Sequence, residues 1–428
     1  MKDLRSVVRG RVLLPGDEEF TDGAKPWNLA VAQPVTAVVN AVDAADIAAV
    51  VRYARDNGLA VAAQPSGHGA SGNADGVILL RTGRLDSVHV DPGTRTARVG
   101  AGVSWGDVQS IAGRFGLAGL SGSSPAVTVA GYTLGGGLSW FGRRYGWAAD
   151  SVTAFDIVDA DGNPARVTAS SDPALFWALR GGGGDFAIVT ALEFTLHPAP
   201  SLYGGRVLWP ADRAPDVLDV FRSITADAPD ALTVWVDLLH FPGADPLVAL
   251  DVTYLGDPAD GHALLRSLDA IGAPISDTRA PMPIAELGSI TAEPTDPGAG
   301  IARGELLTEL TDVTVKALLA APIAPLLSVQ IRHLGGAFAQ PSDSPHGPLT
   351  EPYAIYLFGL PGDGVPARQN DLITDLTPHI SGRKPFTYLA PGENAAAAIT
   401  PDALTRLRTI KRERDPQGVF RSNFPVLD

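Results

Sequence analysis

Three glycine-rich runs in the first half of the chain constrain what it can fold into. They cover Gln64 to Gly72 (QPSGHGASG), Gly131 to Gly137 (GYTLGGG) and Gly181 to Gly184. Backbone without a Cβ can approach a ligand closely and point several N–H groups at one oxygen. Each run alone could be a set of tight turns, because turns are the commonest use of glycine. Three runs in one region favour instead a buried, elongated cofactor that carries phosphate.

The charge balance and the missing residue types exclude several functions. The 47 Asp and Glu outnumber the 33 Lys and Arg, so a net charge of −14 disfavours binding to nucleic acid and anionic lipid. The absence of cysteine excludes disulfides, iron–sulfur clusters, cysteine-ligated zinc and thiol catalysis. The 8 histidines show no metal-ligand spacing, so no metal is expected. No apolar stretch is long enough for a signal peptide or a membrane span, which favours a cytoplasmic protein.

Strand and helix patterns alternate before residue 200. Residues 35–41 read as a short strand, Asp43 as a helix N-cap and residues 59–63 as the next strand, which together predict a βαβ unit. The same reading predicts a helix at 104–116, a β-hairpin around 161–163, a short helix after Asp172 and a strand at 186–196.

The pattern changes after residue 200 to antiparallel strands with intervening helices. Strands are predicted at 232–239, 247–254, 327–332 and 353–360, and helices near 260–271, 304–319 and 400–412. We therefore predict an α+β protein with one domain at 1–199, a second at 200–385 and a C-terminal segment at 386–428.

Four spaced motifs carry a family resemblance. They are PSGHGASG at 65–72, VDPGTRTARVGAGVSWGDV at 90–108, SPAVTVAGYTLGGG at 124–137 and LFWALRGGGGDFAIVT at 175–190. In this order they resemble the flavin domain of the vanillyl-alcohol oxidase / p-cresol methylhydroxylase (PCMH) superfamily, and within it the berberine-bridge-enzyme-like branch. The resemblance extends to RHLGGA at 332–337 and DPQGVFRSNFP at 415–425.

The resemblance implies a fold and a cofactor. FAD would lie extended between a bipartite PCMH-type domain, with its core at about 33–199, and a substrate domain whose antiparallel sheet is backed by helices. The C-terminal segment would return to the FAD domain. In this family a histidine at the His68 position usually bonds through a ring nitrogen to the flavin 8α-methyl. The cysteine that often makes a second bond is replaced by Ser124, so a single link through His68 is expected and no cysteinyl link is possible.

Family placement also gives the expected FAD contacts. These are Ser66, Gly67, His68, Gly69, Ala70, Ser71, Ser124, Val129, Gly131, Thr133, Gly136, Gly137, Asp185, Ile188, Val189 and Asn423. Two departures bear on them. Asp185 stands where the family has an asparagine amide, which puts its cofactor contacts in doubt, and the family's Tyr-x-Asn element is reduced to Tyr388-Leu389-Ala390. Asn423 could also be an ordinary turn residue.

Three tyrosines are the predicted catalytic residues. Tyr388 matches a family tyrosine near the flavin and could act as a phenolate base or simply pack. Tyr132 lies inside the second glycine run and could donate to the flavin pyrimidine edge. Tyr356 is a weaker candidate on a predicted strand, as are Asp237 and His240. Period-two alternation places Gln330 and Arg332 on one face, toward either the substrate or solvent.

The resulting prediction is an FAD-dependent oxidoreductase. It would take a hydride from a C–H next to oxygen or nitrogen of a small molecule onto flavin N5, with O2 as acceptor. Val129 stands where the family gates oxygen with a small residue, which is compatible with an oxidase. The alternatives are a natural-product tailoring dehydrogenase or oxidative cyclase with another acceptor, and a non-catalytic flavin-binding relic. The Ala-, Gly- and Pro-rich composition is typical of a high-GC bacterium, and the substrate and oligomeric state stay open.

Overall fold

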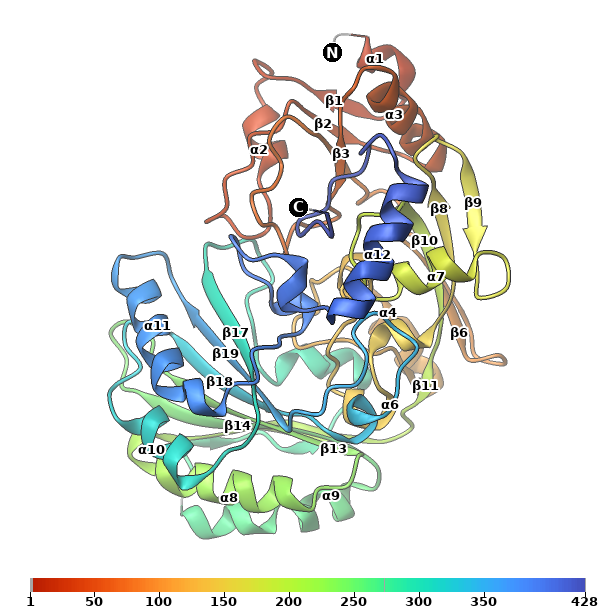
Figure 1. Cartoon of the computed structure of the whole chain (residues 1–428). Helices are drawn as coiled ribbons and strands as arrows, with labels where there is room; N and C mark the ends of the chain where they lie inside the picture. The colour runs from red at the N-terminus through yellow and green to blue at the C-terminus, as the bar shows by residue number, and fades with distance from the viewer. Residues whose placement is uncertain (1–2, 273, 428) are drawn as a thin grey trace.

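A four-stranded sheet near the N-terminus contains the predicted βαβ unit (Figure 1). The computed structural model describes residues 3–272 and 274–427 of the chain. In strand order β1-β2-β4-β3, the last three strands are parallel and β1 is antiparallel to β2. Asp43 caps α3 by accepting hydrogen bonds from the N–H groups of Ala45 and Asp46. The bounds are β1 Arg11–Leu13, β2 Ala37–Asn40, β3 Val61–Ala63, β4 Ile78–Arg81, α1 Leu4–Val7, α2 Phe20–Ala24 and α3 Ala44–Asp56.

A five-stranded antiparallel sheet follows in the order β5-β6-β10-β8-β9, and β7 pairs separately with β11. Ser104 and Asp107 form a capping box at the start of α4, and the Asp172 side chain caps α7. The bounds are β5 Val88–Asp91, β6 Thr96–Gly100, β7 Leu117–Ala118, β8 Val152–Val158, β9 Pro164–Val167, β10 Ile188–Thr195, β11 His197–Pro198, α4 Trp105–Ala112, α5 Val129–Leu134, α6 Gly142–Tyr145 and α7 Pro173–Leu179. The predicted hairpin and both predicted helix starts are confirmed.

An eight-stranded antiparallel sheet forms the second half, with the path β15-β12-β14-β13-β18-β19-β17 and β16 beside β12. Its strands are β12 Leu202–Pro210, β13 Leu232–Leu239, β14 Leu247–Leu255, β15 Ser276–Asp277, β16 Ala280–Pro281, β17 Ile301–Leu307, β18 Ser328–His333 and β19 Tyr353–Gly359. The helices that accompany it are α8 Ala214–Ala226, α9 Pro258–Leu264, α10 Asp312–Leu319 and α11 Gly364–Leu376. The predicted architecture, an antiparallel sheet backed by helices, is confirmed.

The two faces of this sheet differ in character. Val236, Ile331 and Ile355 belong to the apolar core that packs against α8, α10 and α11 on one face (Figure 1). The next residues along the strands point the other way, because side chains alternate along a strand. On that opposite face Trp235 lies directly across from Arg332. This polar and aromatic face is turned toward the first half of the molecule, where Trp235 stacks on Trp140.

One predicted helix is partly wrong. Residues 304–319 were expected to be helical, but the segment up to Leu307 is strand β17 and only α10 follows as a helix. Pairing of β17 with β19 overrides the helix propensity of Glu305, Leu306 and Leu307. Strand β12 and helices α8 and α11 were not predicted.

The C-terminal segment returns to the first half of the molecule. Helix α12 (Pro401–Arg414) lies near α7 (Figure 1). Beyond it the chain runs beside β3, where the Val61 N–H donates to the Val419 carbonyl (2.7 Å) and the Arg421 N–H donates to the Val61 carbonyl (3.0 Å). The predicted domain boundaries after residues 199 and 385 fall between elements and stay predictions. Within the described residues no helix combines the length and apolar character needed to cross a membrane.

Candidate active site

The first glycine run follows β3 and presents His68. The imidazole stacks on the Trp27 indole, with ring centroids 4.0 Å apart and planes 18° apart. Its Nδ1 lies 2.7 Å from Ser66 Oγ, whereas its Nε2 is buried without a hydrogen-bond partner. Burial lowers the pKa of His68 to about 4, so the ring is neutral at pH 7. Gly67 has φ +84°, and a Cβ there would lie 3.0 Å from Pro26, so this position requires glycine.

Asn423 joins the C-terminal segment to the same loop. The Ser71 hydroxyl donates to the Asn423 carbonyl (2.5 Å), and the Asn423 side-chain oxygen accepts from Gln64 Nε2 (3.0 Å). Gly69 lies near Asn423 without crowding it, because a Cβ on Gly69 would lie 3.9 Å from the Asn423 amide nitrogen. Ala70 is buried. Asn423, which is predicted to contact FAD, thus packs against loop residues with the same prediction and does not stand in an isolated turn.

The second glycine run is partly helical. Val129, Gly131 and Thr133 lie in the short helix α5, and Val129 is fully buried. The Ser124 and Thr133 hydroxyls and the Tyr132 phenol are buried without hydrogen-bond partners.

Gly136 and Gly137 follow α5, and both have positive φ angles, of +90° and +82°. A Cβ at Gly136 would lie 2.5 Å from His346 Nε2, and one at Gly137 would lie 2.4 Å from the Tyr132 ring. These two glycines therefore make room for side chains of the protein itself.

The third run positions the C-terminal segment through Asp185. Its carboxylate oxygens accept from the backbone N–H groups of Ser422 (3.2 Å) and Val426 (2.7 Å), and its carbonyl accepts from Lys411 Nζ (2.7 Å). The carboxylate that replaces the family amide is thus engaged by the protein. Ile188 and Val189 follow as the first, buried residues of β10.

The residues fit an extended polar cofactor. Six buried polar atoms without partners come from the glycine motifs and the C-terminal segment: Gln64 Oε1, His68 Nε2, Ser124 Oγ, Tyr132 Oη, Thr133 Oγ1 and Ser422 Oγ. Leaving a buried polar group unpaired costs about 1–3 kcal/mol, so a row of them indicates a missing partner.

The three predicted catalytic tyrosines lie around Arg332. The rings of Tyr356 and Tyr388 are 5.2 Å apart, and the Arg332 guanidinium lies 5.7 Å from each ring centroid. The charges of Arg332 and Tyr388 both act on the pKa of Tyr132, which burial raises well above the ordinary value. The structure therefore brings residues of α5, β18, β19 and the C-terminal segment to one place.

A buried polar row continues from Arg332 across the sheet. Arg332 Nε donates to Gln330 Oε1 (2.6 Å), Gln330 Nε2 donates to Asp237 Oδ2 (3.4 Å), and Ser328 Oγ donates to Asp237 Oδ1 (2.6 Å). Burial raises the pKa of Asp237 to about 7. Asp237 thus supports the site from behind Arg332. His240 is tied to Leu327 by its backbone N–H (2.9 Å), but within the described residues its side chain forms no hydrogen bond to this row.

Comparisons with known proteins agree with this geometry. An FAD binding domain family matches residues 35–168. (R)-6-Hydroxynicotine oxidase of Paenarthrobacter nicotinovorans is 28% identical over 98% of this chain and 97% of that protein. The crystal structure of 6-hydroxy-D-nicotine oxidase from Arthrobacter nicotinovorans superposes with a TM-score of 0.86 at 26% identity, covering 98% of both chains. The fold is also that of the Physcomitrella patens berberine-bridge-enzyme-like protein 1 (TM-score 0.87, 19% identity, 100% and 99% covered).

Over nearly its whole length the chain is similar to FAD-linked oxidoreductases, and its fold is that of a berberine-bridge-enzyme-like protein. The FAD binding domain match and these relatives support FAD as the cofactor of this oxidoreductase.

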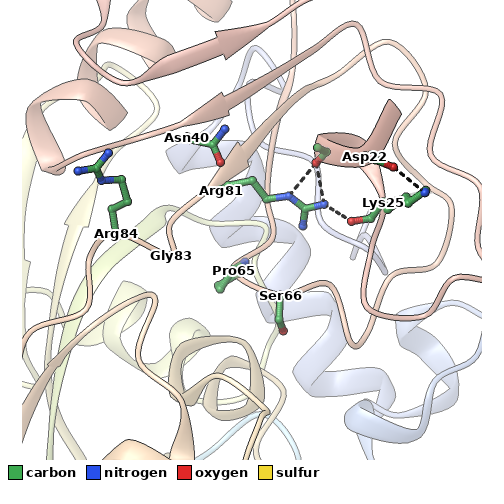
Figure 2. Close-up of a pocket in the computed structure, with 9 residues that line it drawn as sticks. Asp22, Lys25, Asn40, Pro65, Ser66, Arg81, Gly83 and Arg84 are labelled. Carbon is green, nitrogen blue, oxygen red and sulfur yellow. Dashed lines mark hydrogen bonds and ion pairs between the residues drawn. The ribbon is translucent and has the colours of Figure 1, made fainter. Parts of the chain in front are cut away.

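A separate pocket of about 300 Å³ opens beside the first glycine run of the oxidoreductase (Figure 2). Arg81 donates to the carbonyls of Gly23 (3.2 Å) and Lys25 (2.5 Å), and Lys25 Nζ pairs with Asp22 (2.6 Å), as the dashed lines show. These two cations are therefore already engaged. The pocket includes Ser66 but none of the three tyrosines, so we do not assign the substrate site to it.

Sequence reasoning missed two parts of the site. Trp27 lies in the segment before β2, far from His68 in sequence, and no local pattern marks it. Glu293 is half-buried, and its charge raises the pKa of both Tyr356 and Tyr388, so it lies near the tyrosines. Strand alternation gave the signal for Gln330 and Arg332, but no comparable signal marks Glu293.

Proposed function

We propose that this oxidoreductase is an oxidase that takes a hydride from a C–H bond next to oxygen or nitrogen of a small organic molecule, with O2 as acceptor. The observation that carries the proposal is the meeting of Tyr132 and Tyr388 beside Arg332. Both tyrosine hydroxyls are buried, and that of Tyr132, which is part of a glycine motif that fits FAD, has no hydrogen-bond partner within the described residues. The name of the relative (R)-6-hydroxynicotine oxidase also favours an oxidase.

The cofactor would be held by the three glycine motifs and by Asn423, with one covalent bond to a ring nitrogen of His68. When bound, FAD would accept the hydride from the substrate and pass its two electrons on to O2. A neutral imidazole keeps a lone pair on one nitrogen, and the lowered pKa of His68 ensures this at neutral pH. Trp27 holds the His68 ring by stacking on its face, and Ser66 holds it by a hydrogen bond at Nδ1.

The tyrosines would hold the reacting oxygen or nitrogen and its proton. Burial raises the pKa of Tyr388, and the neighbouring Arg332 charge opposes that rise. At neutral pH Tyr388 is therefore a hydrogen-bond donor, and its capacity to accept a proton as phenolate grows with pH. Tyr132 and Tyr356 complete the set, and burial raises the pKa of Tyr356 to about 12.

The two alternatives use the same residues differently. A dehydrogenase or oxidative cyclase would need the same substrate contacts but would exclude O2, and a relic would bind FAD without turnover. Val129, fully buried at the start of α5, is the small residue that favours the oxidase.

The test is a visible spectrum of the purified protein, repeated on pellet and supernatant after acid precipitation. A yellow pellet that turns white in His68→Ala supports the single covalent link. A substrate screen then compares air with a dye acceptor. Fast reoxidation of the reduced flavin in air supports the oxidase, and reoxidation by the dye alone supports the dehydrogenase. A protein that takes up no FAD would overturn the proposal.

A further inference from the structure

Arg332 carries a charge that the described part of the chain leaves without a counter-ion. Its guanidinium lies 4.1 Å over the Trp235 ring, which stacks on Trp140 with centroids 3.4 Å apart. Its Nε donates to Gln330, and its guanidinium also interacts with the Tyr388 hydroxyl, which opposes the rise in the pKa of that phenol. No carboxylate of the described residues forms an ion pair with it, so N–H donors of its terminal nitrogens stay available to a ligand. A half-buried cation with free donors is costly unless a ligand meets it.

The orientation of this guanidinium is fixed from behind. Gln330 accepts from Arg332 and in turn donates to Asp237, whose other oxygen is held by Ser328. The stack on Trp235 restrains the plane of the group. The two terminal nitrogens of Arg332 therefore point in one fixed direction. A planar guanidinium edge of this kind binds a carboxylate through two parallel hydrogen bonds.

No acid of the described residues forms an ion pair with Arg332. Asp251 is bound by two nitrogens of Arg206, at 2.6 and 2.8 Å, and Arg206 also reaches Asp237 at 3.9 Å. Asp237 is fully buried with two side-chain donors, and burial raises its pKa to about 7. Glu293 forms no ion pair or hydrogen bond within the described residues, and its charge raises the pKa of Tyr388. This third carboxylate would repel a second negative charge on a ligand.

Two hydroxyl donors stand beside the same cation. Among the described residues the buried Tyr132 hydroxyl has no hydrogen-bond partner, and the buried Tyr388 hydroxyl lies beside the Arg332 guanidinium. Burial raises the pKa of both phenols, so both stay protonated at neutral pH. One guanidinium edge and the Tyr132 phenol together form a receptor for a single oxyanion, with Tyr388 beside it.

We propose that the substrate is a small monocarboxylate, bound through its carboxylate by Arg332 with Tyr132 as an additional donor, which leaves Tyr388 for the reacting group. The inference deepens the proposed function and rests on it, because it assumes that the oxidised C–H bond belongs to the molecule held there. It places the anionic end of the substrate at β18 and excludes dicarboxylates and phosphates through Glu293.

The test uses FAD-loaded enzyme and two pairs of probes that differ only in charge. Acetate and benzoate are titrated against acetamide and benzamide, and binding is followed by the visible flavin spectrum and by calorimetry. We expect saturable binding of at least one carboxylate and none of its amide at the same concentration. Arg332→Gln should weaken that binding about 10- to 100-fold, and Arg332→Lys by less. Glu293→Gln should tighten it.

Each outcome has one meaning. Equal binding of acid and amide, or unchanged affinity in Arg332→Gln, overturns the carboxylate receptor while the FAD spectrum leaves the proposed function intact. A wild-type protein that takes up no FAD instead overturns the proposed function. Thermal unfolding and FAD content of each variant show that it has folded. If Arg332→Gln does not fold, Glu293→Gln decides alone, since a receptor for an anion requires it to bind benzoate or acetate more tightly than the wild type.

Discussion

The imidazole of His68 and the indole of Trp27 lie face to face, 4.0 Å apart and 18° from parallel. The Trp27 N–H donates to the Ser66 carbonyl (3.0 Å), so the stack is tied to the glycine loop by the backbone as well. The segment then crosses to the second half, where Asn28 Nδ2 donates to the Gly300 carbonyl (3.0 Å). Trp27 thus holds the proposed linking residue and connects its loop to the start of β17.

Trp27→Ala should slow covalent attachment of FAD without preventing FAD binding. An aromatic stack contributes about 0.5–1.5 kcal/mol, which corresponds to roughly a 2- to 10-fold slower rate if the stacked geometry is required for bond formation. The measurement is in-gel flavin fluorescence of denatured protein against time after FAD is added to apoprotein. Trp27→Phe, which keeps a ring, is the control and should stay near the wild-type rate. Equal rates in all three proteins would contradict a positioning role.

The sequence anticipated features that depend on local chemistry and not those that depend on distant packing. The glycine runs, the cap at Asp43 and the His68 loop carry their signal within a few residues. Strand β17 was predicted as a helix because its pairing with β19 leaves no local mark. Gly136 reads as a ligand-facing glycine in sequence, yet the structure uses it to admit His346. The place of Arg332 beside the tyrosines follows only from sheet register.

His346 should make the fold sensitive to acid. It is 2% exposed and stacks on Trp147 (centroids 4.7 Å apart). Burial lowers its pKa to about 4 from 6.5. Because the folded pKa is the lower one, the unfolded chain takes up the proton first, and stability falls as pH drops from about 6.5 to 4. The loss approaches about 3 kcal/mol.

The measurement for His346 is the free energy of unfolding in denaturant across this range. His346→Gln should flatten the pH slope relative to the wild type, whereas a Gln at the exposed His89 should leave it unchanged. Three other histidines also have lowered pKa values: His68, His197 and His333. All three are present in the wild type and in both variants, so a difference in slope reports on His346 alone. Parallel slopes for His346→Gln and the wild type would refute the prediction.

Gly136→Ala should destabilise the protein through the same contact. The added Cβ would meet His346 Nε2 at 2.5 Å on a backbone with φ +90°, so both sterics and conformation oppose it. Strain of this kind costs about 1–3 kcal/mol, before the clash is counted. The double variant Gly136→Ala, His346→Ala should remove the clash but keep the backbone strain, so it should regain only part of the lost stability. Chemical denaturation of the four proteins gives the coupling, and strictly additive losses would show that the two residues do not meet.

Asp237 should make the protein less stable as the pH rises, whereas His346 should make it less stable as the pH falls. Burial raises its pKa from 3.8 to about 7, and the hydrogen bond from Ser328 opposes that rise. The folded protein therefore holds this proton where the unfolded chain has lost it, and stability falls as pH rises from about 4 to 7, by up to about 4 kcal/mol. Asp237→Asn keeps the shape and should be more stable than the wild type at pH 8 but not at pH 4. The control variant is Asp245→Asn, at an exposed position between β13 and β14. It should leave the free energy of unfolding unchanged at both pH values.

Tyr388→Phe separates a reacting phenol from a packing ring. The ring fits closely, since a Cβ on Gly304 would lie 2.3 Å from it, so phenylalanine should preserve the fold. If the hydroxyl holds and accepts the substrate proton, flavin reduction under anaerobic stopped flow should slow about 100-fold with the first substrate found. The wild-type rate should rise with pH without a plateau below about pH 10, because burial raises the pKa of Tyr388 above its ordinary value. The variant should lack this rise. A rate within about threefold of the wild type at every pH would leave Tyr388 as packing and move the search for the proton acceptor to Glu293.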